Sequence, residues 1–561
     1  MATQTWVNFR VRSLSLLFLR VFVLSVIMNL SYLFLFCQQP VEKVNRPQLI
    51  EDLRQLLFIL ENSHPDPYLK GGGKIAFHRR FQEALLEIPE EGMSRKEFYR
   101  FLMPLMASVG DGHTFLVPPW TTGGESVLPI GMNIVGQTVY VEKVFRPGLE
   151  HLFGSRLISV NDIPFPELIE RLKSLISWDN EYQLLTYFCR FLNDKELTET
   201  LIPELRGADS LRIGLELPKG QTYSLEISRQ EKGKDTHVEP PSRINLPSTE
   251  KVDFAYNFLD PRKRTALLRI DGMFSYRENF EFFRSMGAVW VPFQAAAVYR
   301  KIYLHDPPEN LDSLISAIPS ATEVFRNLVI EMKKAGTERL IIDLRKNSGG
   351  NSLMANILAY FLFSEEQLKK TTNSYAVKKY SDLYFANYPN DSLEKINKVR
   401  RLSLDRGDYD FGEDPYFKDR LSLAGSKELE LEEWLKATPT FYKEYKSGLY
   451  KNYYRPPKII IVSSAWTYSS AFTLMSMFYK LGARVVGVPS GQSGTCFGDT
   501  LSFILKNSGI RGFVSYKLFV TFPENPELSK ILTPHGELTY EDLIRFDFDP
   551  NSSILLALQD F

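Results

Sequence analysis

Two short apolar runs in the C-terminal half of the sequence constrain the fold most strongly. One, RLIIDL at 339–344, ends in a glycine turn, and the other, KIIIV at 458–462, leads through a turn into a helical pattern and a further strand. Runs of this length bounded by turn residues are typical of buried strands. Strands that alternate with helices indicate parallel pairing. We therefore expect an α/β sheet here, with one long helix at 309–334.

The rest of the sequence divides into segments of different character. Residues 41–124 carry leucines and phenylalanines at helical spacing, whereas residues 125–230 read as strands, turns and an amphipathic helix. Residues 231–262 are polar and contain prolines, which favours a linker. The α/β region then spans 263–561, and residues 379–450, rich in charge and tyrosine, form an expected surface insertion.

The N-terminal segment 1–40 is expected to be a signal or an anchor. Residues 13–36 are almost entirely apolar, and arginines lie on their N-terminal side. The small residues of a signal cleavage site are missing, and the uninterrupted stretch is slightly short of the roughly 20 residues that span a bilayer. Arg20 can snorkel and extend it. We favour an uncleaved anchor with the arginines inside and the remaining chain periplasmic or extracellular. A buried core helix is the alternative.

Composition excludes several classes of function. The chain has 67 Lys+Arg and 67 Asp+Glu among 561 residues, so no global basic charge favours nucleic acid. Its 44% hydrophobic and 24% charged residues are typical of globular proteins. Three cysteines cannot build a disulfide framework, and no Cys/His cluster has zinc spacing. We expect no metal and no cofactor.

Ser469 and Ser470 are the first candidates for chemistry. They stand where the turn after 458–462 becomes a helix. The first N–H groups of a helix are free, and its dipole favours negative charge there, so a serine at this point suits attack on a carbonyl. The alternative is that one of them is only an N-cap, the commonest role of serine at such a position.

Two glycine-flanked turns supply further candidates. Gly349 and Gly350 follow the strand 340–344, and paired glycines at the carboxyl end of a strand can turn backbone N–H groups toward a ligand. Such a turn can form half of an oxyanion hole, or it can be a turn and nothing more. His113, in the segment DGHT, has the residue type of a general base, although an isolated histidine is commonly structural.

These segments together resemble the C-terminal-processing (tail-specific) serine proteases. Asp111–Thr114, Asp343–Arg345 with the glycine pair, Thr467–Ala471 and Gly487–Gly491 occur in the order of that family, whose relatives include the tricorn core and the interphotoreceptor retinoid-binding protein. The resemblance covers about residues 47–561. It implies a crotonase/ClpP-like α/β catalytic domain preceded by a PDZ-like module, here the 125–230 unit.

The resemblance also implies the catalytic roles. One style in the family pairs serine with lysine, but Ser493 stands at that lysine position. The tricorn style uses the histidine of the DGHT segment and a late glutamate. It implies Ser469 as nucleophile, His113 as base and Glu527 as the acid of the triad, with Glu524 as the second choice. It further implies an oxyanion hole formed by Gly350, Ser470 and Gly349, with the backbone N–H groups of Gly350 and Ser470 as donors.

The sequence therefore predicts a membrane-anchored serine endopeptidase of the cell envelope that acts on peptides or proteins. The alternative is a non-catalytic protein on the same fold that holds an apolar ligand or a peptide terminus, which 40 Phe and 27 Tyr would suit. A crotonase-like acyl-transfer enzyme is less favoured, because the serine motif would then have no role.

Overall fold

The structure is a computed structural model, and it describes residues 43–120, 126–231, 240–368, 371, 373–414, 435–449 and 453–559. The expected anchor segment lies outside the described residues, as does the middle of the expected insertion. In the described part of the chain, no helix is both long and apolar enough to span a membrane.

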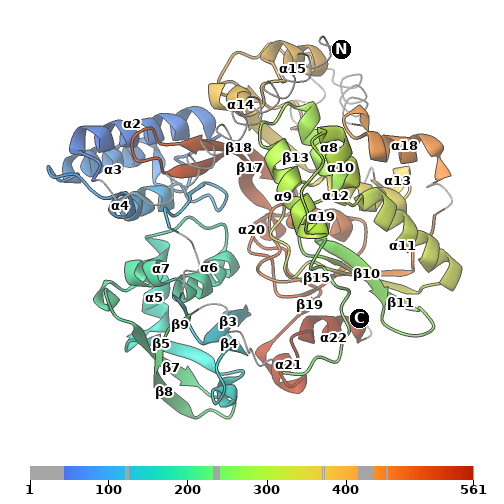
Figure 1. The fold of residues 1–561 in the computed structure, drawn as a ribbon, viewed down its shortest axis with the longest axis horizontal. Coiled ribbons are helices and arrows are strands. Elements are labelled where there is room, and N and C mark those ends of the chain that lie inside the picture. The colour runs from blue at the N-terminus through green and yellow to red at the C-terminus, as the bar shows by residue number, and fades with distance from the viewer. Residues whose placement is uncertain are drawn as a thin grey trace, which may run out of the picture.

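A six-stranded sheet lies at the centre of the C-terminal half (Figure 1). Its first two strands pair antiparallel, and every later pair is parallel, which confirms the predicted α/β arrangement. In spatial order the strands are β10 (Phe254–Phe258), β11 (Thr265–Ile270), β12 (Arg339–Asp343), β15 (Lys458–Ser463), β16 (Arg484–Gly487) and β19 (Gly536–Glu537). Because β10 belongs to this sheet, the sheet begins inside the segment 231–262 that the sequence assigned to a linker.

Both faces of this sheet are covered, which explains why the middle of β12, residues 340–342, is apolar without interruption. Leu340 and Ile342 pack into one core with α11 (Ala321–Ala335), α12 (Leu353–Leu362) and α19 (Ser470–Lys480). Ile341, on the opposite face, joins the core that contains residues of α22 (Ser552–Leu558). A strand buried on both faces cannot alternate apolar and polar residues.

The helix predicted at 309–334 is wrong as a single element. The structure has two helices, α10 (Leu311–Ala317) and α11, separated at Pro319. A proline disfavours helical backbone in the residue before it. The Ser320 side chain then accepts a hydrogen bond from the N–H of Glu323 and caps the second helix.

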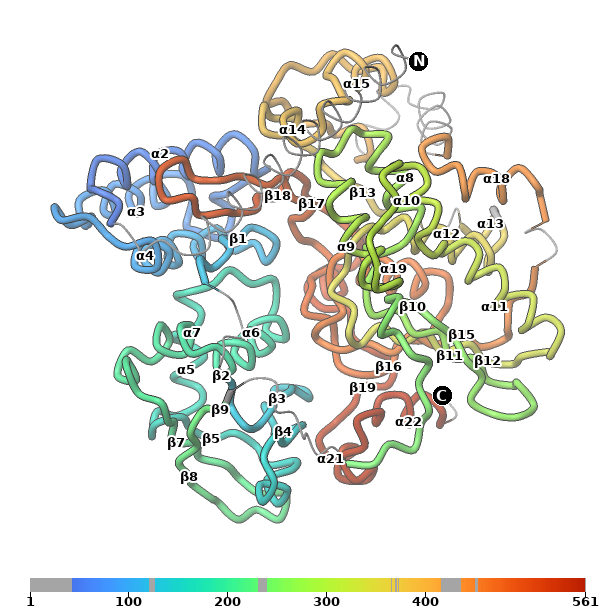
Figure 2. The backbone as a smooth tube through the Cα atoms, viewed as in Figure 1, coloured from blue at the N-terminus to red at the C-terminus, as the bar shows by residue number. Residues whose placement is uncertain are grey.

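A second sheet pairs a short strand from the N-terminal region with strands from the C-terminal half. The long hairpin of β17 (Thr495–Ile504) and β18 (Arg511–Val520) pairs with β13 (Tyr375–Lys379) and with β1 (Phe115–Leu116). Figure 2 shows the N-terminal helices lying beside this hairpin. These helices are α2 (Arg46–Ser63), α3 (Gly73–Glu87) and α4 (Arg95–Ala107), and Ser94 caps the last in a capping box.

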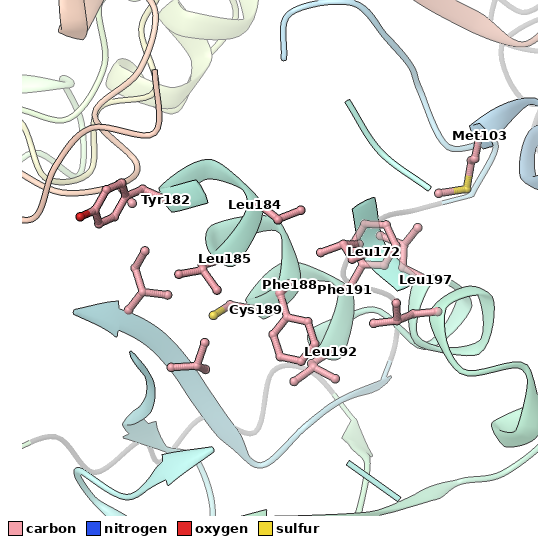
Figure 3. Close-up of a cluster of buried hydrophobic side chains, with 14 of the residues drawn as sticks. Met103, Leu172, Tyr182, Leu184, Leu185, Phe188, Cys189, Phe191, Leu192 and Leu197 are labelled. Carbon is pink, nitrogen blue, oxygen red and sulfur yellow. The ribbon is translucent and has the colours of Figure 1, made fainter. Parts of the chain in front are cut away.

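A third, antiparallel sheet is built from residues that follow β1. Its strands are β3 (Ile130–Val135), β4 (Thr138–Val144), β5 (Arg156–Val160), β7 (Ser210–Glu216) and β8 (Thr222–Ser228), with β6 (Ile163–Pro164) on β5; β2 (Ser126–Val127) pairs separately with β9 (Gln230–Glu231). Its helices are α5 (Phe165–Lys173), α6 (Glu181–Asn193) and α7 (Lys195–Leu201). Figure 3 shows the buried side chains of α6, among them Leu185, Phe188 and Leu192, which anchor that helix in the core.

The remaining helices lie around the central sheet and the hairpin. They are α8 (Arg277–Ser285), α9 (Val291–Tyr303), α13 (Glu365–Leu368), α14 (Asp382–Asn387), α15 (Leu393–Arg400), α18 (Pro439–Ser447), α20 (Pro526–Lys530) and α21 (Tyr540–Arg545), with the short strand β14 (Tyr409–Asp410) on β13 and single 3-10 turns at Glu150–Leu152 and Pro203–Leu205.

Candidate active site

Ser469 occupies the N-cap position of α19 in a strained conformation. Its φ is 54° and its ψ is −122°, and its side chain makes no capping hydrogen bond. This pair of angles lies outside the left-handed helical region that side chains tolerate, and such strained backbone clusters at functional sites. Its N–H donates to Oε1 of Gln492 at 2.5 Å. The capping alternative therefore does not describe the side chain of Ser469, whose hydroxyl carries no cap.

The glycine turn lies directly against this serine. β12 and β15 are neighbours in the sheet, so the loops that follow their carboxyl ends meet. A Cβ on Gly349, whose φ is +108°, would lie 2.6 Å from the Cβ of Ser469. The turn therefore needs glycine because another backbone approaches it closely.

Two backbone N–H groups beside Ser469 are available to a ligand. Within the described residues, no hydrogen bond uses the N–H of Gly350 or of Ser470, and both residues line one cleft with Ser469. The N–H of Gly349 instead donates to Oδ1 of Asn347 at 2.9 Å. The two N–H groups expected as donors, those of Gly350 and Ser470, are thus free. The assignment of Gly349 to the oxyanion hole is wrong, because its N–H is already used by Asn347, and Gly349 contributes only its small size.

His113 reaches the same cleft from the N-terminal region. The strand β1, which follows it, pairs with Phe513 and Gly512 of β18. Its Nδ1 lies 3.2 Å from the hydroxyl of Tyr468, and the two ring centroids are 4.6 Å apart. No hydrogen bond joins His113 to Ser469 among the described residues, although both line the cleft of about 1120 Å³. Because Nδ1 faces Tyr468, Nε2 is the nitrogen that remains for a substrate or Ser469.

Asp111 holds the loop that carries His113. Its Oδ1 accepts the N–H of His113 at 2.8 Å, and its Oδ2 accepts from Nε2 of His64 at 3.1 Å and from the hydroxyl of Ser515 at 2.6 Å. The carboxylate is fully buried. Burial alone would raise its pKa, but the His64 hydrogen bond and the other donors hold the pKa of Asp111 well below its ordinary value.

A buried acid that the sequence analysis missed lies behind His113. Asp179 accepts the hydroxyl of Tyr468 at 2.7 Å through Oδ2 and the N–H of Gly112 at 3.1 Å through Oδ1. Burial raises the pKa of Asp179, and the charge of His113 opposes that rise. Tyr468 stands next to Ser469 in the TYSSA segment, so its proximity could have been foreseen. Asp179 only precedes the N-cap of α6, and no sequence signal marks it.

Comparison with known proteins then decides the family. Residues 311–510 match the model of peptidase family S41, and this range contains the glycine turn and Ser469. Residues 311–510 belong to peptidase family S41. The resemblance to the C-terminal-processing proteases is thereby confirmed, and the chain is a serine-type peptidase, a hydrolase. No curated protein matches its sequence.

Solved structures of mature CPAF share this fold over nearly the whole chain. Mature CPAF complexed with lactacystin is 15% identical over 91% of this chain and 98% of the other, with a TM-score of 0.54. Mature CPAF without the inhibitor is also 15% identical, over 91% of this chain and 96% of the other, with a TM-score of 0.54. The photosystem II D1 C-terminal processing protease is 13% identical over 88% of this chain and 93% of the other, with a TM-score of 0.36. At these identities, the two CPAF structures show a shared fold.

The structure does not bring Glu527 to the S41 site. Glu527 lies in the first turn of α20 with its side chain 83% exposed, and it pairs with Lys530 at 3.2 Å. It is not among the residues that line the cleft, and Glu524 is exposed as well. The side chain of Asn525 caps this short helix by accepting from Leu528, which turns the glutamate of its first turn toward solvent.

The cleft of the peptidase is lined by aromatic and charged side chains. Helices α8 and α9 and the loops around them contribute Phe274, Phe282, Phe283 and Trp290, and the described part of the insertion contributes Tyr384, Tyr388, Lys395 and Arg400.

In the part of the chain that the structure describes, no group of three or more His, Cys, Asp or Glu side chains is placed to hold a metal ion.

Proposed function

We propose that this S41 peptidase is a serine endopeptidase that cleaves peptide bonds through an acyl-enzyme on Ser469. The observation that carries the proposal is the strained Ser469 beside two free N–H groups, in one cleft with His113. Peptides or proteins are the substrates. His113 accepts the proton of the Ser469 hydroxyl as the oxygen attacks the carbonyl carbon. The N–H groups of Gly350 and Ser470 stabilise the resulting oxyanion.

In the same proposal, Tyr468 and Asp179 perform the orienting role that the sequence assigned to Glu527. The Tyr468 hydroxyl donates to Asp179, so its oxygen is free to accept a hydrogen bond from Nδ1–H of His113. That hydrogen bond leaves Nε2 unprotonated as the base. His113 then gives its proton to the leaving amine, and water hydrolyses the ester by the same route in reverse.

Further parts of the proposal concern the architecture and location. We assign the six-stranded sheet and its helices to a crotonase/ClpP-like domain. We assign the antiparallel unit that contains β3 to β8 to a PDZ-like module, which captures peptide segments in other proteins. Residues 13–36 anchor the chain in a membrane, with the site on the periplasmic or extracellular side. The apolar length of that segment and its flanking arginines support this placement.

A fluorophosphonate probe tests the nucleophile. The full-length protein is treated with the probe, and the labelled peptide is identified by mass spectrometry. We expect a label on Ser469, none in Ser469→Ala, and strongly reduced labelling in His113→Ala, with unchanged melting temperatures. Because the CPAF structure of similar fold holds lactacystin, we expect lactacystin to compete for the same serine. A folded parent that takes no label would instead favour the non-catalytic binding protein.

A further inference from the structure

A second, smaller cavity opens beside Ser469 along the length of α19. It has a volume of about 350 Å³ and is lined by Ser469, Ser470, Thr473, Met477 and Lys480 of that helix. Most of these residues recur at intervals of three and four, so they share one helical face. His113 also lines this cavity. The cavity therefore runs from the reacting atoms toward the C-terminal end of α19.

The wall of this cavity is rich in hydroxyl groups. Besides the serines and the threonine of α19 it includes Ser352, Thr371, Ser374 and Thr521, whereas Ala376, Met477, Cys496 and Phe519 supply the apolar part. Hydroxyls can both donate and accept hydrogen bonds. Such a wall tolerates a polar group that would be costly to bury in an apolar pocket.

Lys480 is a cation without an acidic partner. Its Nζ donates to Oδ1 of Asn373 at 2.7 Å, to the hydroxyl of Ser374 at 2.5 Å and to the carbonyl of Thr521 at 2.6 Å. All three acceptors are neutral, and no ion pair of Lys480 occurs in the described part of the chain. Burial lowers its pKa to about 8, and the more distant Glu524 opposes that shift.

The other charged groups that face the cavity are already paired. Glu413 lies 2.7 Å from Nζ of Lys378, and Asp499 lies 2.5 Å from Nζ of Lys517. His113 is at the opposite end, with its Nδ1 facing Tyr468. Within the described residues, Lys480 is therefore the lining cation whose charge no neighbouring carboxylate balances.

We propose that this cavity is a specificity subsite that binds a carboxylate of the peptide substrate, which displaces one of the three neutral acceptors of Nζ and takes Lys480 as its counter-ion. The inference rests on the proposed peptidase function of Ser469. Two sources share this chemistry: the side chain of an aspartate or glutamate near the cleaved bond, and the free carboxyl end of the substrate. Lys480 follows Ser469 by eleven residues, about 16 Å along the helix axis, and helical side chains lean back toward the N-terminus. Lys480 thus recognises a group near the cleaved bond but does not touch the reacting atoms.

The test compares matched fluorogenic peptides on the full-length protein. One arm places glutamate or glutamine at each position flanking the cleaved bond, and the other compares a free carboxyl end with an amidated end. We expect kcat/KM to be at least about tenfold higher for the carboxylate member of one pair. Lys480→Met should abolish that preference, and Lys480→Arg should retain it. Lys530→Met, an exposed lysine outside the cavity, is the control and should match the parent.

The outcomes separate this inference from the proposed function. Cleavage without preference in either arm, or an undiminished preference in folded Lys480→Met, overturns the subsite and leaves the peptidase assignment standing. A folded protein that neither cleaves peptides nor takes the fluorophosphonate label overturns both. A preference confined to the first arm identifies a side-chain carboxylate, and one confined to the second identifies the carboxyl terminus.

Discussion

The hydroxyl of Tyr468 lies 3.2 Å from Nδ1 of His113, although the two residues are 355 positions apart. The same hydroxyl donates to the buried Asp179 at 2.7 Å. Burial raises the pKa of Tyr468 well above its ordinary value, so the hydroxyl keeps its proton and can act as a bridge. An acid thus acts on the histidine through an intervening side chain, and the exposed Glu527 plays no part in that arrangement.

We predict that removing this bridge slows catalysis without preventing folding. Tyr468→Phe should lower kcat by about 10- to 100-fold, because one hydrogen bond that orients a charged group contributes about 1.5–3 kcal/mol. It should also alter the acidic limb of the pH profile of kcat/KM, which reports the free base. Glu527→Gln is the control and should behave as the parent. A large loss in Glu527→Gln with none in Tyr468→Phe would return the acid role to the glutamate.

Gly349→Ala is predicted to remove activity because the added methyl group would lie 2.6 Å from the Cβ of Ser469. We expect at least about a 100-fold loss of fluorophosphonate labelling rate. Gly336→Ala is the matched control: its φ is also positive, at +66°, but no atom lies within 4 Å of the added methyl. It should cost only the backbone strain, about 1 kcal/mol, and keep full labelling. Equal loss in both variants would contradict the close-approach argument.

Asp111→Asn is predicted to destabilise the protein in a pH-dependent way. The pKa of Asp111 is lower in the folded state than in the unfolded chain. Its contribution is therefore complete above the unfolded pKa of about 4 and is lost as the pH falls through the lower folded value. We expect a loss of about 3 kcal/mol in the free energy of unfolding at pH 7. The difference from the parent should shrink in urea titrations below pH 4. A difference that stays constant with pH would exclude a charge effect.

The carboxylate preference of the proposed subsite should depend on pH. Because burial lowers the pKa of Lys480 to about 8, the ammonium is lost above that pH. The ratio of kcat/KM for the glutamate and glutamine peptides, or for the free and amidated ends, should be constant below about pH 7. It should then fall by up to about tenfold per unit above pH 8. In Lys480→Arg the ratio should remain flat to pH 10, because guanidinium stays protonated. A fall in both proteins would point to another titrating group.

Local sequence patterns were sufficient for several parts of the site. The strand at 458–462 and the helix after it follow from a short apolar run and a helical stripe, so the position of Ser469 at a helix start could be read directly. The glycine pair followed in the same way from the end of β12. Pro319 and Ser320 also indicate the break between α10 and α11. The helical spacing of the apolar residues on both sides nevertheless led to the prediction of one continuous helix.

The sequence by itself therefore determined the family motifs, their order and the local elements that carry them, because periodicity, glycine turns and helix starts are properties of neighbouring residues. Only the tertiary structure decided which distant side chains meet. Asp179 lies behind His113 because α6 is anchored by its buried face and β1 is held by β18. Glu527 points to solvent because a short capped helix carries it away from the cleft. Such contacts depend on how separate elements pack together, and no local pattern records that packing.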